Sequence, residues 1–302
     1  MSKILIGNSL DKNSLIPLKV GITLSKKLNK EALVLHADKL ADYETLDSVF
    51  AHLNLEVHKN YIESILDANN TALEKQLKSI GVEFENISFE SISGSPSEVL
   101  LAEASSGDID LIVIGHNNDK SIVDLFLGSV TGSITHKASK PVLIAKDEKC
   151  AAPKKIAVAY NFSYHCEKAL EWAINLAKEN KAELELVNIL PCYYQGYHVA
   201  HTLSNNFNEA LEEMIQESLQ KIKSKLKIKE DEITALGIKT KSTVILDKDG
   251  SIPDKIIDYV NADDFDLITM GTHARGKVAE LFLGSVANRV IKKSKASVLI
   301  SK

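Results

Sequence analysis

The chain has 302 residues, about two domains at roughly 150 residues each. It carries 36 basic and 41 acidic residues, a net charge of −5, and its 25% charged and 44% hydrophobic residues exclude disorder and collagen-like repetition. This mild acidity gives no reason to expect nucleic acid as the main partner. No apolar run approaches a membrane span and no leader segment precedes the first predicted strand, so we expect no membrane association.

The chain contains three cysteines, Cys150, Cys166 and Cys192. The number is odd, and their spacing matches neither a disulfide framework nor a metal site. We therefore expect free thiols and a cytoplasmic location, where thiols stay reduced.

Short apolar runs alternate along the chain with longer segments of helical period. Expected strands in the first half cover residues 3–7, 32–36, 85–90, 110–114 and 141–145. In the second half they cover Ile156–Tyr160, Leu184–Val187, Thr243–Leu246, Asp266–Met270 and Ser297–Ile300. Apolar residues at helical spacing, for example Ala169, Ala173 and Ala177, predict helices between them. Strands alternating with helices favour a parallel sheet covered on both faces. The sequence predicts two doubly wound α/β domains.

An internal repeat divides the chain in half. Leu111–Gly115 resembles Leu267–Gly271, and the run Leu125–Val130 recurs as Leu281–Val286. The offset is the same for both pairs of glycines, since 271 − 115 and 284 − 128 are both 156. A repeat of this length indicates a duplicated domain. We predict domains at 1–147 and 153–302, joined by a short polar segment that ends at Pro153.

Two glycines recur in each half near the predicted carboxyl edge of the sheet. Gly115 and Gly271 end the fourth strands, while Gly128-Ser129 and Gly284-Ser285 each precede a helical pattern. A helix N-terminus offers free N–H groups and a partial positive charge, which suits a phosphate. The simpler interpretation is that both serines cap their helices. The sequence leaves both interpretations open.

The order Gly-x2-Gly-x9-Gly-Ser after the fourth strand resembles the nucleotide-binding signature of universal stress proteins. Met270–Gly276 followed by Leu281–Val286 carries this resemblance most closely, and it covers nearly the whole chain as two tandem copies. The resemblance implies a five-stranded parallel sheet of order 3-2-1-4-5 in each domain. It also implies ATP or AMP bound at the ends of strands one and four. The family's last strands pair across a twofold-like interface, so we predict an intramolecular pseudo-dimer of the halves; further association into homodimers is left open.

The chain departs from the family pattern at two places in each half. The middle glycine of the signature is Asn118 in the first half and Ala274 in the second. The family's acidic residue after strand one is assigned to Asn8 and Asn161. Asparagine hydrogen-bonds ribose or adenine but lacks the charge that Mg²⁺ prefers. These departures argue against a magnesium-assisted site.

The second half is predicted to carry the better nucleotide site. Arg275 follows Ala274 and complements phosphate charge, although a solvated loop arginine is an equal alternative. In the first half Asp119 follows Asn118 and opposes an anion. The predicted nucleotide-binding residues are Asn161, Gly271, His273, Ala274, Arg275, Gly284, Ser285 and Val286. Weaker first-half equivalents are Asn8, Gly115, Asn118, Gly128, Ser129 and Val130.

Other candidates have simpler explanations. Gly94–Ser97 and Gly250–Pro253 are explained as helix starts, and the family resemblance implies that these loops also line the nucleotide pocket. His198 and His201 lie in an aromatic segment, residues 191–201, which is better explained as a surface loop than as an adenine lid or a metal site. The alternating lysines from Lys221 to Lys229 indicate a solvated helix end.

The sequence therefore predicts a regulatory protein of the stress response that binds an adenine nucleotide. The alternative is an interaction module of the same fold whose pockets have lapsed and which serves an unidentified protein partner. No nucleophile and base are suitably spaced, so slow ATP hydrolysis is the most enzymatic activity that we expect.

Overall fold

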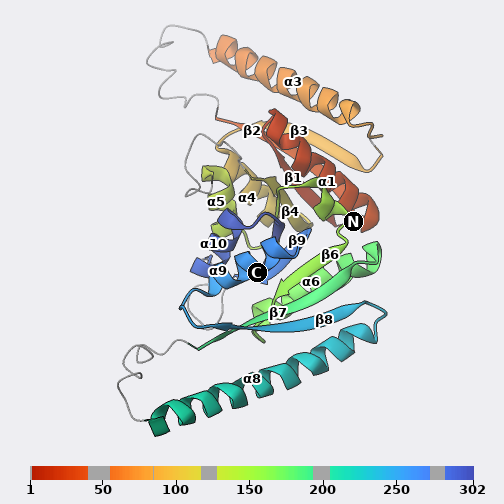
Figure 1. Cartoon of the computed structure of the whole chain (residues 1–302). Helices are drawn as coiled ribbons and strands as arrows, with labels where there is room; N and C mark the ends of the chain where they lie inside the picture. Colours follow the sequence, from red (N-terminus) through yellow and green to blue (C-terminus); the bar gives the residue numbers. More distant parts are fainter. Residues whose placement is uncertain (1, 40–54, 84, 117–127, 193–204, 273–282) are drawn as a thin grey trace. The chain divides into compact units, whose positions relative to one another are not determined.

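The computed structural model describes residues 2–39, 55–83, 85–116, 128–192, 205–272 and 283–302 (Figure 1). The described chain divides into two compact units, the first ending at Ala151 and the second starting at Ala152. The expected pairing of the two last strands concerns the placement of one unit against the other and stays a prediction.

The first unit is built on a five-stranded parallel sheet. Its strands are β1 (Lys3–Asn8), β2 (Glu31–Asp38), β3 (Ile87–Ser93), β4 (Ile109–Gly115) and β5 (Val142–Ala145). Neighbouring strands pair in the order β3-β2-β1-β4-β5, which confirms the predicted order 3-2-1-4-5. Ile4, Leu5 and Ile6 of the central strand are completely buried.

Helices cover both faces of this sheet. Helices α1 (Leu15–Lys27) and α3 (Leu55–Ser79) follow β1 and β2, whereas α4 (Pro96–Ser106) and α5 (Ser129–Lys137) follow β3 and β4. Because crossovers between parallel strands are right-handed and the strand order reverses at β1, α1 and α3 cover one face and α4 and α5 the other. Two short 3-10 turns, η1 (Lys12–Ser14) and η2 (Glu148–Ala151), complete the unit.

The second unit repeats this arrangement. Its strands are β6 (Lys155–Ala159), β7 (Glu183–Pro191), β8 (Thr240–Asp247), β9 (Leu267–Gly271) and β10 (Ser297–Ser301), and its helices are α6 (Tyr164–Asn180), α8 (Asn205–Thr234), α9 (Ile252–Ala262) and α10 (Ser285–Lys293). The strands pair in the order β8-β7-β6-β9-β10, all parallel. Figure 1 shows the long helix α8 lying along β8. The predicted doubly wound fold is confirmed in both units.

Serine and proline residues explain where two of the helices begin. Ser95 and Ser251 are the N-cap residues of α4 and α9, and each helix has a proline in its first turn. Proline suits this position because N–H groups in the first turn have no acceptor within the helix. Proline, which has no N–H, therefore loses no hydrogen bond there. No described helix is long and apolar enough to cross a membrane.

Candidate functional site

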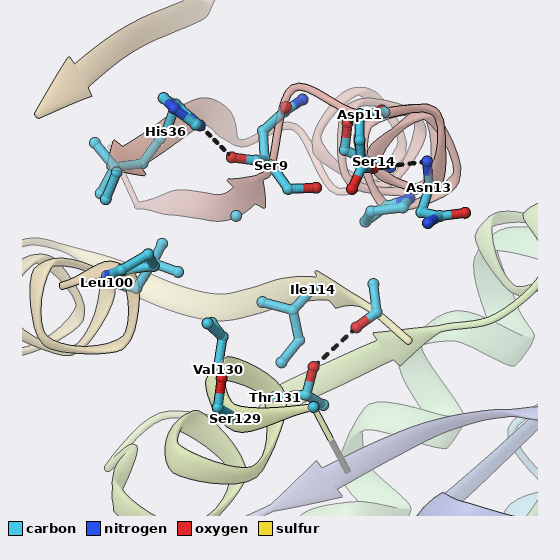
Figure 2. Close-up of a pocket in the computed structure, with 18 of the residues that line it drawn as sticks. Ser9, Asp11, Asn13, Ser14, His36, Leu100, Ile114, Ser129, Val130 and Thr131 are labelled. Carbon is cyan, nitrogen blue, oxygen red and sulfur yellow. Dashed lines mark hydrogen bonds between the residues drawn. The ribbon is translucent and has the colours of Figure 1, made fainter. Parts of the chain in front are cut away.

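A cavity of about 360 Å³ opens at the carboxyl edge of the first unit's sheet (Figure 2). Its lining includes five residues that the sequence predicts as ligand contacts: Asn8, Gly115, Gly128, Ser129 and Val130. They are drawn from the end of β1, the end of β4 and the start of α5. This is the edge where open parallel sheets bind ligands, at the point where the strand order reverses.

The end of β1 and the end of β2 form one wall of the cavity. Figure 2 shows Ser9 and His36 on this wall, with Leu100 and Ile114 lying between them and α5. His36 is buried, and its Nδ1 lies 2.9 Å from the carbonyl oxygen of Asn8. Since a carbonyl only accepts, His36 donates this bond, which fixes the position of its ring.

The start of α5 forms the opposite wall. Gly128 is the N-cap residue, and Ser129 is the first residue inside the helix. The same holds for Gly284 and Ser285 at the start of α10. The capping interpretation of the two serines is therefore wrong. Because the exposed hydroxyl of Ser129 stands beside the free N–H groups of the first turn, it is available to a ligand.

A hydrogen bond ties α5 to the end of β4. Thr131 Oγ1 donates to the carbonyl oxygen of Gly115 at 3.1 Å, and Thr131 is buried. This contact holds the helix N-terminus next to the strand end. The sequence motif named the glycine and the serine but missed Thr131, which is two residues further along the helix.

Two carboxylates line the cavity, and neither was predicted. Asp11 Oδ1 accepts the N–H groups of Asn13 at 2.8 Å and Ser14 at 3.1 Å, which fixes the side chain at the start of η1. Asp38 ends β2, with its Oδ2 3.9 Å from His36 Nε2. The available signal was that Asp11 closely follows β1 and Asp38 ends β2, because strand ends meet at this edge.

No lysine or arginine is among the described residues that line the cavity. His116, which follows β4, lines it, but burial and the nearby Lys146 lower the pKa of His116 to about 4. Burial also lowers the pKa of Lys146, to about 8. At neutral pH His116 is therefore uncharged, and the described lining is net negative.

The register of the strands corrects the sequence-based prediction that Asn8 and Asn161 occupy equivalent positions in the two units. Ile6 lies opposite Val113 in the first unit, and Val158 lies opposite Thr269 in the second. Because Val113 and Thr269 differ by the repeat offset, 269 − 113 = 156, Ile6 corresponds to Val158.

Counting onward from that pair, Asn8 corresponds to Tyr160, and Asn161 corresponds to Ser9. Leu10 and Phe162, the next residues, both have a left-handed backbone, with φ of 60° and 62°. Asn8 and Asn161 are therefore not equivalent, and the position expected to be acidic is Ser9 in the first unit.

In the second unit, the residue predicted to contact ribose is engaged within its own loop. Asn161 Oδ1 accepts the Ser163 N–H at 3.1 Å and faces Cys166 Sγ at 2.9 Å. Tyr160, the counterpart of Asn8, is buried and donates its hydroxyl to Glu167. These bonds stabilise the turn that begins α6.

The strand-end glycine of the second unit has a packing role. A Cβ at Gly271 would lie 2.7 Å from the Cβ of His165, so only glycine lets α6 approach β9 this closely. A Cβ at Gly284 would lie 2.6 Å from the carbonyl oxygen of Thr272, which also accepts the Gly284 N–H at 3.0 Å. Helix packing therefore explains both glycines without a ligand.

Several predicted residues lie outside the described residues: Asn118, His273, Ala274, Arg275, His198 and His201. Of the second-half prediction, Asn161, Gly271, Gly284, Ser285 and Val286 are placed, at the carboxyl edge of the second sheet. Their proposed contacts with a nucleotide stay predictions.

The remaining candidates have structural explanations. Lys221, Lys227 and Lys229 of α8 form ion pairs along the helix, with Glu217, Asp231 and Glu232. The three cysteines are buried, and none of them is in a disulfide. No group of three or more metal-ligating side chains occurs in the part of the chain that the structure describes.

The fold and the cavity define a tandem α/β protein with a ligand-sized cleft at the carboxyl edge of its first sheet. The family model described as "Universal stress protein family" matches residues 1–146 and 153–302. The chain belongs to the universal stress protein family, with two copies of the family's domain in one chain.

Similar sequences are found among known universal stress proteins, and a similar fold among solved structures. The universal stress protein MJ0577 of Methanocaldococcus jannaschii is 31% identical over 91 residues, 30% of this chain and 49% of its own length. A universal stress protein of Staphylococcus saprophyticus is 30% identical over 156 residues, 49% of this chain and 82% of its own. A universal stress protein from Archaeoglobus fulgidus has a TM-score of 0.68 at 20% identity, over 99% of this chain and 98% of that chain.

Proposed function

We propose that the protein binds an adenine nucleotide, ATP or AMP, and that the site lies at the carboxyl edge of the first unit's sheet. The observation that carries the proposal is the convergence of Asn8, Gly115, Ser129 and Val130 on one cavity. These residues are up to 122 positions apart (130 − 8), yet the family signature connects them with one ligand.

The chemistry of the cavity suits a nucleoside. Leu35, Leu100 and Ile114 offer an apolar surface for a base, and Ser9, Asn13 and Ser14 offer hydroxyl and amide groups for ribose. The N-terminus of α5 supplies N–H groups and a partial positive charge for a phosphate. Binding of this kind needs no nucleophile.

The sequence predicted the better nucleotide site in the second unit. One matched pair of variants tests which unit binds the nucleotide. Val130 and Val286 are the second residues of α5 and α10, and both are half-buried. Val130→Trp fills the first cavity, whereas Val286→Trp makes the same change in the second unit. Nucleotide binding is measured by calorimetry with AMP and by acid release of ligand from the purified protein.

We expect Val130→Trp to weaken AMP binding by at least about tenfold and Val286→Trp to leave it unchanged, because a filled cavity excludes the ligand. The opposite pattern would place the site in the second unit, as predicted from the sequence. If the wild-type protein neither releases nucleotide nor gives heat with AMP or ATP, the proposal fails.

That last outcome would favour an interaction module of the same fold, with a protein partner. The engagement of Asn161 with Ser163 and Cys166 is the observation that supports this alternative for the second unit. A unit whose ribose contact is already satisfied gains less from a nucleotide.

A further inference from the structure

The charge of the first cavity bears on which adenine compound it takes. Asp11 and Asp38 line it, and the described lining contains no lysine or arginine. Aspartate side chains are negatively charged at neutral pH. A polyphosphate chain placed in this cavity would therefore meet charges of its own sign.

Asp11 cannot easily turn away from the cavity. Its Oδ1 accepts two backbone N–H groups and thereby organises the turn η1. Asp38 is the last residue of β2 and lies opposite Ser93 in the sheet, so its backbone is held by strand pairing. Both negative charges are thus part of the built structure of the site.

Among the described residues that line the cavity, the N-terminus of α5 is where a phosphate meets positive charge. The N-terminus of α5 carries about half a positive charge. Lys146 lowers the pKa of His116 but is not among the residues that line the cavity. His116 and His36 both line it, and His36 has Asn8 as its partner at Nδ1. Beyond the first phosphate, the described lining contains the carboxylates of Asp11 and Asp38 and no lysine or arginine.

A divalent cation is not provided for by the described residues. Compensation of a triphosphate by Mg²⁺ requires oxygen ligands that converge on the ion. No group of three or more acidic, histidine or cysteine side chains converges in that way among the residues that the structure describes. Asp11 is, in addition, already engaged with Asn13 and Ser14.

We propose that the first-unit cavity selects adenosine and adenosine monophosphate over the di- and triphosphate, with Asp11 and Asp38 as the residues that reject the longer phosphate chains. The inference rests on the proposed function, because it presupposes an adenine ligand. The cavity volume of about 360 Å³ is consistent with it, since that is near the lower end of ligand pockets.

The test measures the affinity of the full chain for adenosine, AMP, ADP and ATP by calorimetry, with and without MgCl₂. We expect AMP to bind at least about tenfold more tightly than ATP in both buffers, because like charges repel in a partly buried site. The double variant Asp11→Asn/Asp38→Asn should bring ATP to within about threefold of AMP. Asparagine still accepts backbone N–H groups, so η1 is preserved.

Two further variants complete the design. Asp108→Asn removes an exposed charge directly before β4, at the opposite edge of the sheet, and should leave the AMP to ATP ratio unchanged. Ser129→Asp adds a negative charge at the first residue of α5. It should weaken AMP and spare adenosine while the helix keeps its stability, because acids are favoured in the first turn.

Failure of the inferred selectivity can be distinguished from failure of the proposed nucleotide binding. ATP binding as tight as AMP in either buffer, or an AMP to ATP ratio that the double variant does not change, overturns the inference while nucleotide binding stands. Selectivity that survives Val130→Trp but is lost in Val286→Trp overturns it as well, since the site would then lie in the second unit. Absence of heat with all four ligands refutes the proposed function and the inference together.

Discussion

Gly271 lies directly against the backbone of His165: a Cβ added to Gly271 would stand 2.7 Å from His165 Cβ and 2.8 Å from its carbonyl carbon. Both values are below any normal contact between carbon atoms. The end of β9 and the first turn of α6 therefore pack at a distance that only glycine allows.

We accordingly expect Gly271→Ala to destabilise the second unit by about 1–3 kcal/mol, the usual cost of overpacking. Trp172 is the only tryptophan in the chain and lies in α6, so its fluorescence during urea unfolding reports on this packing. Gly115→Ala is the matched change in the first unit, since its added Cβ would meet Pro17 Cγ at 3.3 Å, and it should cost less when unfolding is followed by far-UV circular dichroism. A midpoint that Gly271→Ala leaves unchanged would refute the packing role.

Glu185 is a second position where the structure predicts a large effect. This β7 side chain is 1% exposed, and its Oε1 accepts from Thr243 Oγ1 at 2.7 Å and Tyr259 OH at 2.5 Å. Lys241 pairs with Oε2 at 2.9 Å. Because Glu185→Ala leaves two half-buried hydroxyls without their acceptor, we expect a loss of about 1–3 kcal/mol for each.

Glu183→Ala is the control for Glu185. Glu183 lies two residues earlier on the same strand and pairs with Lys239 at the surface, where an ion pair contributes about 0–1 kcal/mol. The free energy of unfolding of both variants is measured with Trp172 fluorescence in urea. Equal losses would show that the buried network contributes nothing beyond a surface pair.

The lowered pKa of His116 predicts how the free energy of unfolding depends on pH. Its pKa is about 4 in the folded protein against 6.5 for an exposed histidine, so the unfolded chain binds the proton more tightly. The folded state is therefore favoured above pH 6.5 and loses stability as the pH falls toward 4. The slope from this one group is at most about 1.4 kcal/mol per pH unit.

The comparison with His116→Gln isolates this contribution from the chain's other eight histidines. Urea midpoints are followed by far-UV circular dichroism at pH 7 and pH 5. The wild type should lose more stability over this interval than the variant. If the two lose the same amount, His116 is not protected from protonation in the folded state.

The repeat predicted much of the fold because strand and helix patterns survive in both copies. The glycines at 115 and 271 end β4 and β9 as predicted, and α5 and α10 begin at Ser129 and Ser285. Apolar alternation with helical period is a property of individual segments, so it can be read without knowing their neighbours. The family resemblance supplied the strand order.

The candidate site was harder to predict because it depends on register and on side chains brought together by folding. Asn8 and Asn161 look equivalent since the residue type is the same, but only the pairing of β1 with β4 and of β6 with β9 shows that Asn8 matches Tyr160. Asp11 and Asp38 carry no motif and enter the cavity through strand ends that are 27 residues apart (38 − 11). Nor did the sequence show that α6 occupies the space beside Gly271.

After the first strand of each unit, one residue has a left-handed backbone, and this conformation is common to both copies of the duplicated domain. Leu10 and Phe162 hold φ of 60° and 62°, a conformation that bulky side chains adopt only under constraint. The copies differ in side chain here, yet the bend of the backbone is the same, so it is the shape of the turn that has been inherited. Each copy is thereby free to present its own chemistry at an identical corner: an aliphatic group in one, and in the other an aromatic ring, 38% exposed, with Lys225 5.9 Å from its centre.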